Sequence, residues 1–420
     1  MSRTGRSSTG DRNPGKAVGG PGYSSSVVAS SLGSAAERRA RLAARHRLAA
    51  PARAGSAAEV AESLIALHGT DPASVYLAVW ARTGAVDPAA IDRALYEEQA
   101  LVRMLGMRRT MFVVPVDLAP VIQAACTDQI AERLRRRLVQ QLEQAGVGAD
   151  PAGWLKDVDE ATVQALTARA SATGAELAAD EPRLRTQLVY AEEKSYGGPQ
   201  NITSRVLMLL SAEGRIVRGR PRGGWTSSQY QWSPAGAALR GDPSPSPGAA
   251  RTELARRWLR AFGPAPAADL QWWTGWTAGQ VRTALAQLRT AEVDIGGTAG
   301  IALADDQAAE PPGQPWAALL PALDPSAMGW QARGWFLGEH GPPLFDRSGN
   351  IGPTVWWEGR VIGGWAQRKD GEIVFRLLED AGPDAVAAVT AEAERLQAWL
   401  AAVRITPRFR TPLERELSSG

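Results

Sequence analysis

A pattern of helices followed by a basic β-hairpin occurs three times in this 420-residue chain and constrains the fold more than any other feature. In the first copy we predict helices at 35–48, 57–67, 75–80 and 87–98, and two strands within 101–115. The last of these helices begins at Asp87-Pro88, since Asp is a favoured N-cap and Pro suits the first helical position. Helices followed by a hairpin are the plan of a winged helix.

The same plan is predicted twice more along the chain. The second copy has helices at 159–171, 173–177 and 201–212, and a hairpin from 213 to 232. The third copy has helices at 252–262, 264–273 and 277–288, and strands at 293–295 and 300–303. Tandem recurrence of one supersecondary unit indicates an array.

After residue 309 the apolar period changes to two, which is typical of strands. We predict strands at 334–337, 354–357, 360–367 and 372–376, and a closing helix at 384–403. The tryptophans Trp356, Trp357 and Trp365 fit the core of this sheet better than a base-stacking platform. The expected fold is mainly α with α+β modules: three tandem winged-helix domains, then a small C-terminal β-barrel or curved sheet with its closing helix.

The segments expected from this plan cover the whole chain. They are a disordered tail (1–33), winged helices at 34–118, 119–240 and 249–308, a linker at 241–248, a β-barrel with its helix at 309–404, and a basic tail at 405–420.

Composition limits the kind of protein this can be. Hydrophobic residues make up 44% of the chain, enough for packed cores, yet no run of about 18 apolar residues occurs. Cys126 is the single cysteine, and the three histidines lie far apart, so we expect neither a disulfide nor a metal site. A cytoplasmic monomer is the expectation.

Arginine dominates the basic residues, with lysine present at only four positions. Arginine binds phosphate bidentately and stacks on bases, so the bias suits a nucleic-acid partner. A genome rich in G and C would produce the same bias, because alanine and glycine are abundant as well. The hairpin with Arg215, Arg218, Arg220 and Arg222 has no acid among these residues, which favours an anionic partner. A protein-interaction array is the alternative.

The stretch from Ser63 to Pro72 is the strongest candidate for chemistry. We predict that a helix ends here and presents His68, Thr70 and Asp71. The simpler interpretation is that Thr70 or Asp71 caps the next helix and His68 is a half-buried side chain. The alternative is that His68 and Thr70 point into a groove and position a water for cleavage of an N-glycosidic bond.

A second candidate is the turn that carries Gln367, Arg368 and Lys369. Its polar, basic tip could enter a groove, although a solvated turn would have the same sequence.

Three stretches resemble the AlkZ-like group of winged-helix DNA-binding proteins: 64–115, 344–357 and 377–380. The resemblance covers about residues 35–415. It implies a C-shaped tandem of winged helices with a basic concave channel and double-stranded DNA as partner. It also implies a monofunctional DNA glycosylase that excises bulky N7-alkylated purines and unhooks interstrand crosslinks, without metal or cofactor, in some members for self-resistance.

The resemblance also implies site residues. The family has two polar residues separated by one, Gln-x-Gln, Gln-x-Asp or a His-containing variant, where this chain has His68-Gly69-Thr70. Thr70 departs from this pattern and cannot act as a base at neutral pH, which shifts the base role to His68 or Asp71. The turn at Gln367 aligns with the family's lesion-probing hairpin.

Double-stranded DNA is expected to contact a further set of basic and polar residues: Arg103, Arg108, Arg109, Arg215, Arg218, Arg220, Arg222, Gln367, Arg368, Lys369, Arg408 and Arg410. A non-catalytic regulator or lesion sensor, and a protein-interaction scaffold, remain alternatives to the glycosylase.

Overall fold

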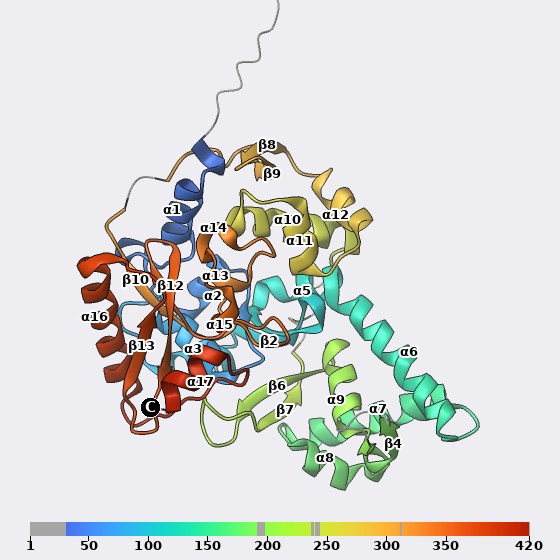
Figure 1. The fold of residues 1–420 in the computed structure, drawn as a ribbon. Coiled ribbons are helices and arrows are strands. Elements are labelled where there is room, and N and C mark those ends of the chain that lie inside the picture. The colour runs from blue at the N-terminus through green and yellow to red at the C-terminus, as the bar shows by residue number, and fades with distance from the viewer. Residues whose placement is uncertain (1–30, 191–197, 237–238, 240–243, 311–312, 420) are drawn as a thin grey trace, which may run out of the picture.

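The computed structural model describes residues 31–190, 198–236, 239, 244–310 and 313–419 (Figure 1). The predicted disordered tail lies outside these residues, except that 31–33 form a 3-10 turn whose Leu32 packs against Val293 and Ala302. Part of the predicted linker, 241–243, also lies outside them.

The first unit has four helices and a three-stranded antiparallel sheet. The helices are α1 (Ala35–Arg45), α2 (Ala57–Ser63), α3 (Pro72–Trp80) and α4 (Pro88–Tyr96). The strands are β1 (Leu67–His68), β2 (Leu101–Leu105) and β3 (Met111–Pro115), in the order β1-β3-β2. As predicted, Asp87 caps α4 and Pro88 opens it.

The helix predicted at 57–67 was wrong at its end. It stops at Ser63 because Ile65 has a φ of 66°, a left-handed conformation that a β-branched residue rarely adopts and that no helix can continue through. The chain then runs into β1, where Leu67 pairs with Val113 and His68 with Phe112. His68 is therefore presented by a strand edge and not by a helix end.

The second unit is the most helical part of the chain. Its helices are α5 (Ala119–Ile122), α6 (Asp128–Gln144), α7 (Pro151–Arg169), α8 (Gly174–Asp180) and α9 (Thr203–Ala212). Its hairpins are β4–β5 (Gln187–Tyr190, Gly198–Asn201) and β6–β7 (Ile216–Pro221, Tyr230–Pro234). The sequence did not predict α6, and the helix expected at 159–171 is the second half of α7. A separate core between Leu138 and Ile216 holds this unit together, and α6 connects it to the rest of the molecule (Figure 1).

The third unit follows the prediction most closely. Its helices are α10 (Pro247–Phe262), α11 (Ala267–Thr274) and α12 (Ala278–Leu285), followed by the hairpin β8–β9 (Thr290–Ile295, Thr298–Leu303). Thr277 and Gln280 form a capping box that fixes the start of α12. The assignment of the three units as winged helices stays a prediction.

The C-terminal part contains an open sheet, so of the two forms predicted, a barrel or a curved sheet, the barrel was wrong. Its strands β10 (Ala317–Leu320), β11 (Thr354–Trp357), β12 (Arg360–Gln367) and β13 (Ile373–Leu377) lie in chain order, and β10 does not pair with β13. The helices here are α13 (Pro325–Met328), α14 (Gly334–Leu337), α15 (Gly341–Leu344), α16 (Gly382–Leu400) and α17 (Pro412–Ser419). The strand predicted at 334–337 is the short helix α14. Trp356 and Trp365 are buried in the sheet core, as expected.

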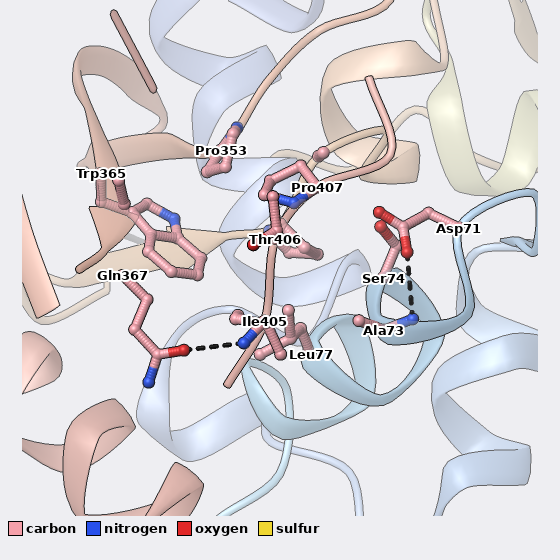
Figure 2. Close-up of a pocket in the computed structure, with 13 residues that line it drawn as sticks. Asp71, Ala73, Ser74, Leu77, Pro353, Trp365, Gln367, Ile405, Thr406 and Pro407 are labelled. Atoms are coloured by element: carbon pink, nitrogen blue, oxygen red, sulfur yellow. Dashed lines mark hydrogen bonds between the residues drawn. The ribbon is translucent and has the colours of Figure 1, made fainter. Parts of the chain in front are cut away.

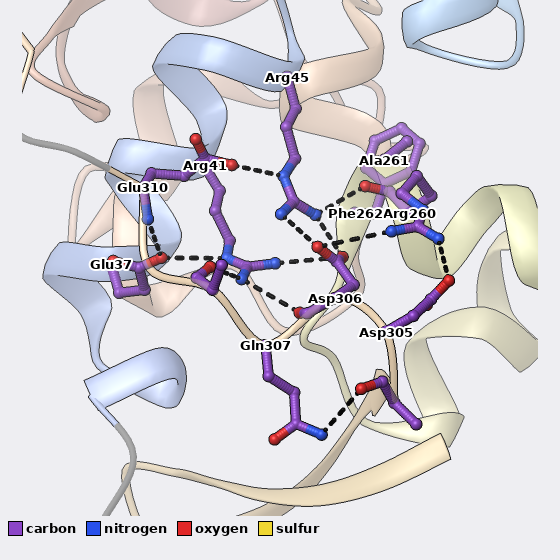
Figure 3. Close-up of polar contacts among 12 residues, drawn as sticks. Glu37, Arg41, Arg45, Arg260, Ala261, Phe262, Asp305, Asp306, Gln307 and Glu310 are labelled. Carbon is purple, nitrogen blue, oxygen red and sulfur yellow. Dashed lines mark hydrogen bonds and ion pairs between the residues drawn. The ribbon is translucent and has the colours of Figure 1, made fainter. Parts of the chain in front are cut away.

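One hydrophobic core runs through the first unit, the third unit and the C-terminal sheet. Buried ion pairs join these parts. Arg82, at the end of α3, binds Asp324 over 2.7 Å, and both side chains are fully buried. Arg41 and Arg45 of α1 bind Asp306, which follows β9 (Figure 3). The first unit is thus fixed to two later parts of the chain.

Among the described residues, no helix is both long enough and apolar enough to cross a bilayer.

Candidate active site and nucleic-acid interface

His68 lies at the end of β1, on the edge of the first sheet. Its ring packs edge-on against Phe112 of β3, with 5.4 Å between ring centroids. The side chain is 9% exposed, and Nδ1 is fully buried without a hydrogen-bond partner among the described residues, whereas Nε2 is not fully buried. Burial, together with the nearby Arg108 guanidinium, lowers the pKa of His68 to about 3. The imidazole is therefore neutral at physiological pH.

Gly69 holds the backbone between the two candidate polar residues. Its N–H donates to the Met111 carbonyl over 2.8 Å, which continues the β1–β3 pairing by one residue, and its carbonyl accepts a hydrogen bond from Arg103 over 2.7 Å. A Cβ at Gly69 would lie 3.1 Å from the Arg103 guanidinium nitrogen, so the position has little room for a side chain. Both peptide groups that flank the site are fixed.

Thr70 follows, two residues after His68. β1 ends at His68, and the chain bends at Thr70 and Asp71 before it enters α3. Thr70 is half-buried, and its hydroxyl makes no hydrogen bond to a described residue. The hydroxyl is therefore available to a water or a ligand.

Asp71 has a structural task. It caps α3, because one carboxylate oxygen accepts a hydrogen bond from the Ala73 N–H over 3.2 Å (Figure 2). The other oxygen accepts from the Arg408 N–H over 3.0 Å. Burial raises the pKa of Asp71, against the opposing effect of these hydrogen bonds. The capping alternative considered from the sequence is therefore correct for Asp71, and the carboxylate also ties the C-terminal segment to α3.

A small cavity of about 20 Å³ lies beside Asp71 and has room for about one water molecule. Asp71 and Ser74 of α3 line one side, while Trp365 and Gln367 of β12 lie on the other (Figure 2). Neither His68 nor Thr70 lines it. The cavity therefore borders Asp71 and is not shared with His68 or Thr70.

A cluster of cations and aromatic rings lies near His68. Arg108, in the β2–β3 turn, stacks over Trp272 of α11 with its guanidinium carbon 4.0 Å from the ring centroid. Arg333 lies over Trp272 at 5.0 Å and over Phe345 at 5.1 Å. Burial, aided by the neighbouring Arg108 charge, lowers the pKa of Arg333 to about 10. The sequence did not predict Trp272, Arg333 or Phe345, because they lie roughly 200 to 280 residues after His68 along the chain.

A groove of about 490 Å³ runs between the β2–β3 turn, α6 and the end of α11. Its lining includes four exposed arginines and no acidic residue: Arg108, Arg109, Arg133 and Arg137. Arg133 and Arg137 are one helical turn apart on α6 and make no ion pair with a described residue. We call this the arginine groove. Its two α6 arginines were missed because the helix itself was not predicted.

The β6–β7 arginines are less free than their sequence indicates. Carboxylates from other elements pair with three of them at 2.8 Å: Glu160 with Arg215, Glu97 with Arg220, and Glu176 with Arg222. The fourth, Arg218, is held over the rings of Tyr230 and Trp232. Carboxylates of the protein thus neutralise three of the four arginines, so the sequence argument that this hairpin lacks acids and favours an anionic partner applies only to Arg218.

The β12–β13 turn places only part of the predicted tip at the surface. Gln367 is 8% exposed, accepts a hydrogen bond from the Ile405 N–H over 2.8 Å and donates to the Val403 carbonyl, so it is a structural residue of β12. Arg368 pairs with Glu372, whereas Lys369 is exposed. The prediction of Gln367 as a DNA-contacting tip residue conflicts with its burial.

The remaining predicted DNA contacts lie in different surroundings. Arg103 is 2% exposed, so it cannot reach a phosphate on the open surface as predicted. Arg410 pairs with Glu414, while the Arg408 side chain is exposed. Of the predicted contacts, Arg108 and Arg109 alone line the arginine groove.

The profile of the family "DNA glycosylase AlkZ-like" matches residues 61–399, which include the His68 segment and the arginine groove. The chain belongs to the AlkZ-like DNA glycosylase family.

The solved structure of the Streptomyces sahachiroi DNA glycosylase AlkZ has the same fold. The TM-score is 0.66 at 21% identity, over 88% of this chain and 98% of that one. A comparison with curated protein sequences finds no match. The resemblance inferred from the sequence is thereby confirmed at the level of family and fold.

Proposed function

We propose that this AlkZ-like chain is a monofunctional DNA glycosylase that hydrolyses the N-glycosidic bond of bulky N7-alkylated purines, crosslinked ones included. One observation carries the proposal: a neutral His68 at the end of β1 and the unbonded Thr70 hydroxyl lie two residues apart, with the Gly69 carbonyl between them held by Arg103, beside a cationic-aromatic cluster. Membership of a DNA glycosylase family supports it.

The acid–base state of the site favours a substrate whose base is already charged. With a pKa of about 3, His68 cannot act as a general acid near neutral pH. An N7-alkylated purine carries a positive charge, so it takes the electron pair of the breaking C1′–N9 bond and departs neutral without being protonated. Neutral purines need a proton on departure, and His68 does not supply one.

Water completes the reaction. His68 accepts a hydrogen bond from the attacking water through Nε2, and Thr70 orients the same water. The water oxygen bonds to C1′, and its proton passes to solvent by way of the imidazole. The Asp71 carboxylate, fixed by its two backbone hydrogen bonds, contributes negative charge that favours cation character on the sugar.

The arginine groove is the proposed main track for the DNA backbone. Its four arginines face no acid across the groove, and each phosphate they neutralise releases counterions. Arg108 belongs both to this groove and to the cluster with Trp272 and Arg333, so it connects backbone binding to the His68 site. A planar, cationic or aromatic cluster of this kind suits stacking of an extruded base.

The test is a comparison of two duplexes that differ only in the lesion, one with a single N7-alkylguanine and one with a single neutral purine lesion such as hypoxanthine. The proposal predicts alkali-labile abasic product from the first duplex and none from the second. Abasic product from the neutral lesion at a comparable rate would contradict the charge argument, since it requires a general acid.

A second function, a lesion sensor that binds without cleaving, is favoured by a different observation. His68 is only 9% exposed, and Thr70 replaces the amide or carboxylate that resemblance to the family leads us to expect. A sensor would bind the N7-alkylguanine duplex more tightly than the unmodified one and release no base. The same pair of duplexes therefore decides between the two functions.

A further inference from the structure

A second cavity, of about 410 Å³, lies between the first and second units. Its walls come from the end of α4, from β2 and from the β6–β7 hairpin. The volume falls in the range of small-molecule sites, which is about 300 to 1,000 Å³. The cavity does not include His68, Thr70 or Asp71.

The residues at this cavity have an unusual number of unsatisfied polar atoms. Three buried donor atoms of its lining residues have no hydrogen-bond partner among the described residues: Nε of Arg103, Nε of Arg218 and the hydroxyl of Tyr96. Buried polar groups are nearly always paired in native proteins, because an unpaired one costs about 1–3 kcal/mol. Three such donors on the residues of one cavity indicate a ligand that accepts hydrogen bonds.

The charge of the cavity points the same way. The Arg103 and Arg218 guanidinium carbons lie 4.8 and 5.3 Å from the centroid of the same Tyr230 ring. Arg103 is 2% exposed, and the pKa of Arg218 is lowered by burial and then by the Arg103 charge. The one carboxylate on the lining, Glu97, is already bound to Arg220. Three arginines against one glutamate leave two positive charges in excess.

We propose that this cavity binds a phosphate group carried by a nucleotide. The phosphate accepts hydrogen bonds from Arg103, Arg218 and the Tyr96 hydroxyl, and it neutralises the excess charge. The cavity is larger than a lone phosphate needs, and the remaining volume takes the sugar and base. The proposal does not depend on glycosylase activity.

The site is connected to the candidate active site by one side chain. Arg103 Nη1 donates to the Gly69 carbonyl, between His68 and Thr70, while its Nε is left for the cavity. A bound phosphate therefore fixes the orientation of the guanidinium that holds this carbonyl. Occupancy of the cavity would stiffen the His68 segment.

Calorimetric titration of the full chain with deoxyguanosine 5′-monophosphate and with deoxyguanosine tests the proposal. We expect the monophosphate to bind and the nucleoside to bind about tenfold more weakly or not at all. Arg218→Gln should reduce monophosphate affinity by about tenfold, and Tyr96→Phe should reduce it less. Arg215→Gln is the matched control, because Arg215 lies on the same hairpin but pairs with Glu160 outside the cavity, and its affinity should not change. Thermal melting of each variant verifies folding.

Competition with undamaged duplex DNA identifies the source of the phosphate. Displacement of the monophosphate by duplex, with weaker duplex binding in Arg218→Gln than in Arg215→Gln, assigns the cavity to the DNA backbone. Binding of monophosphate without displacement assigns it to a separate nucleotide. Equal affinity of the chain for the nucleoside and the monophosphate would overturn the proposal. It would also be overturned if the Arg218→Gln variant bound both the monophosphate and the duplex as tightly as the Arg215→Gln variant does.

Discussion

The carbonyl oxygen of Gly69 accepts a hydrogen bond from Arg103 over 2.7 Å, and Arg103 is almost fully buried. The peptide between the two candidate polar residues, His68 and Thr70, is thus held by the charged guanidinium of Arg103, which lies on β2. A charged donor gives a stronger hydrogen bond than a neutral one, so this contact fixes the segment more firmly than backbone pairing alone. The position of His68 and Thr70 depends on it.

Gly69→Ala should disturb this arrangement. The added methyl group would lie 3.1 Å from the Arg103 guanidinium nitrogen and 3.4 Å from the Met111 carbonyl, so either Arg103 or β1 must move. We expect single-turnover base excision to fall by at least about tenfold, because small displacements of positioned groups lower rates strongly. Gly84→Ala is the control, since a Cβ there meets no described heavy atom within 4 Å. Equal loss in both variants would show that Gly69 has no special role.

Removal of the α6 arginines should weaken DNA binding without affecting chemistry at saturation. Arg133→Gln and Arg137→Gln each remove one proposed phosphate contact, so each should lower the slope of log affinity against log salt by about 0.9. Arg136→Gln on the same helix is the matched control, because Arg136 pairs with Glu132 and does not line the groove. An unchanged salt slope in both groove variants would place the DNA elsewhere.

The buried pair between Arg82 and Asp324 should contribute to stability and not to catalysis. Asp324→Asn leaves the fully buried guanidinium without its counter-ion, although Arg82 keeps hydrogen bonds to Ser326 and to the His46 carbonyl. Breaking a buried pair costs about 3–5 kcal/mol of unfolding free energy. Urea unfolding measures the loss of unfolding free energy in Asp324→Asn. Asp305→Asn is the control, because the Asp305 carboxylate is exposed in the unmodified chain. A small loss in Asp324→Asn, no larger than that of the control, would contradict the assignment.

The sequence predicted the helical units well where local signals were strong. The Asp87-Pro88 start of α4 and the Thr277 to Gln280 capping box of α12 are local features, and both helices begin where expected. The prediction from the sequence failed where tertiary contacts determine the secondary structure. The apolar residues from Leu64 to Leu67 look like a continuation of the helix that precedes them. The left-handed conformation of Ile65 ends that helix, and pairing with β3 makes Leu67 and His68 a strand. Nothing local indicates that β10 and β13 stay apart.

Site residues were predictable only as far as they are neighbours in sequence. The pattern His68-Gly69-Thr70 is visible in the chain and carries the family resemblance. The partners that shape it come from distant segments: Trp272 and Arg333 around Arg108, and the Arg408 N–H on Asp71. The charge of the β6–β7 hairpin was misjudged for the same reason, because its neutralising carboxylates lie on other elements.

The pH dependence of excision should be flat where an ordinary histidine would titrate. His68 has a pKa of about 3, lowered from 6.5 by burial, so its neutral form, which accepts the hydrogen bond from water, persists as pH falls from about 8 to about 5. Protonation, and with it loss of rate, begins only near pH 3. Single-turnover rates across this interval, after subtraction of spontaneous base loss from free DNA, provide the check. A fall centred near pH 6.5 would mean that His68 is far more solvated than the structure shows.

The most direct measurement is the single-turnover rate of base release from a duplex with one N7-alkylguanine, with enzyme in excess, for the unmodified chain, His68→Ala and His340→Ala. His340 pairs with Glu379, away from the site, and serves as the control. The account predicts abasic product from the unmodified chain and from His340→Ala, and a rate lower by about 100-fold in His68→Ala at unchanged duplex affinity. Equal rates in all three proteins, or no base release by the unmodified chain, would contradict it.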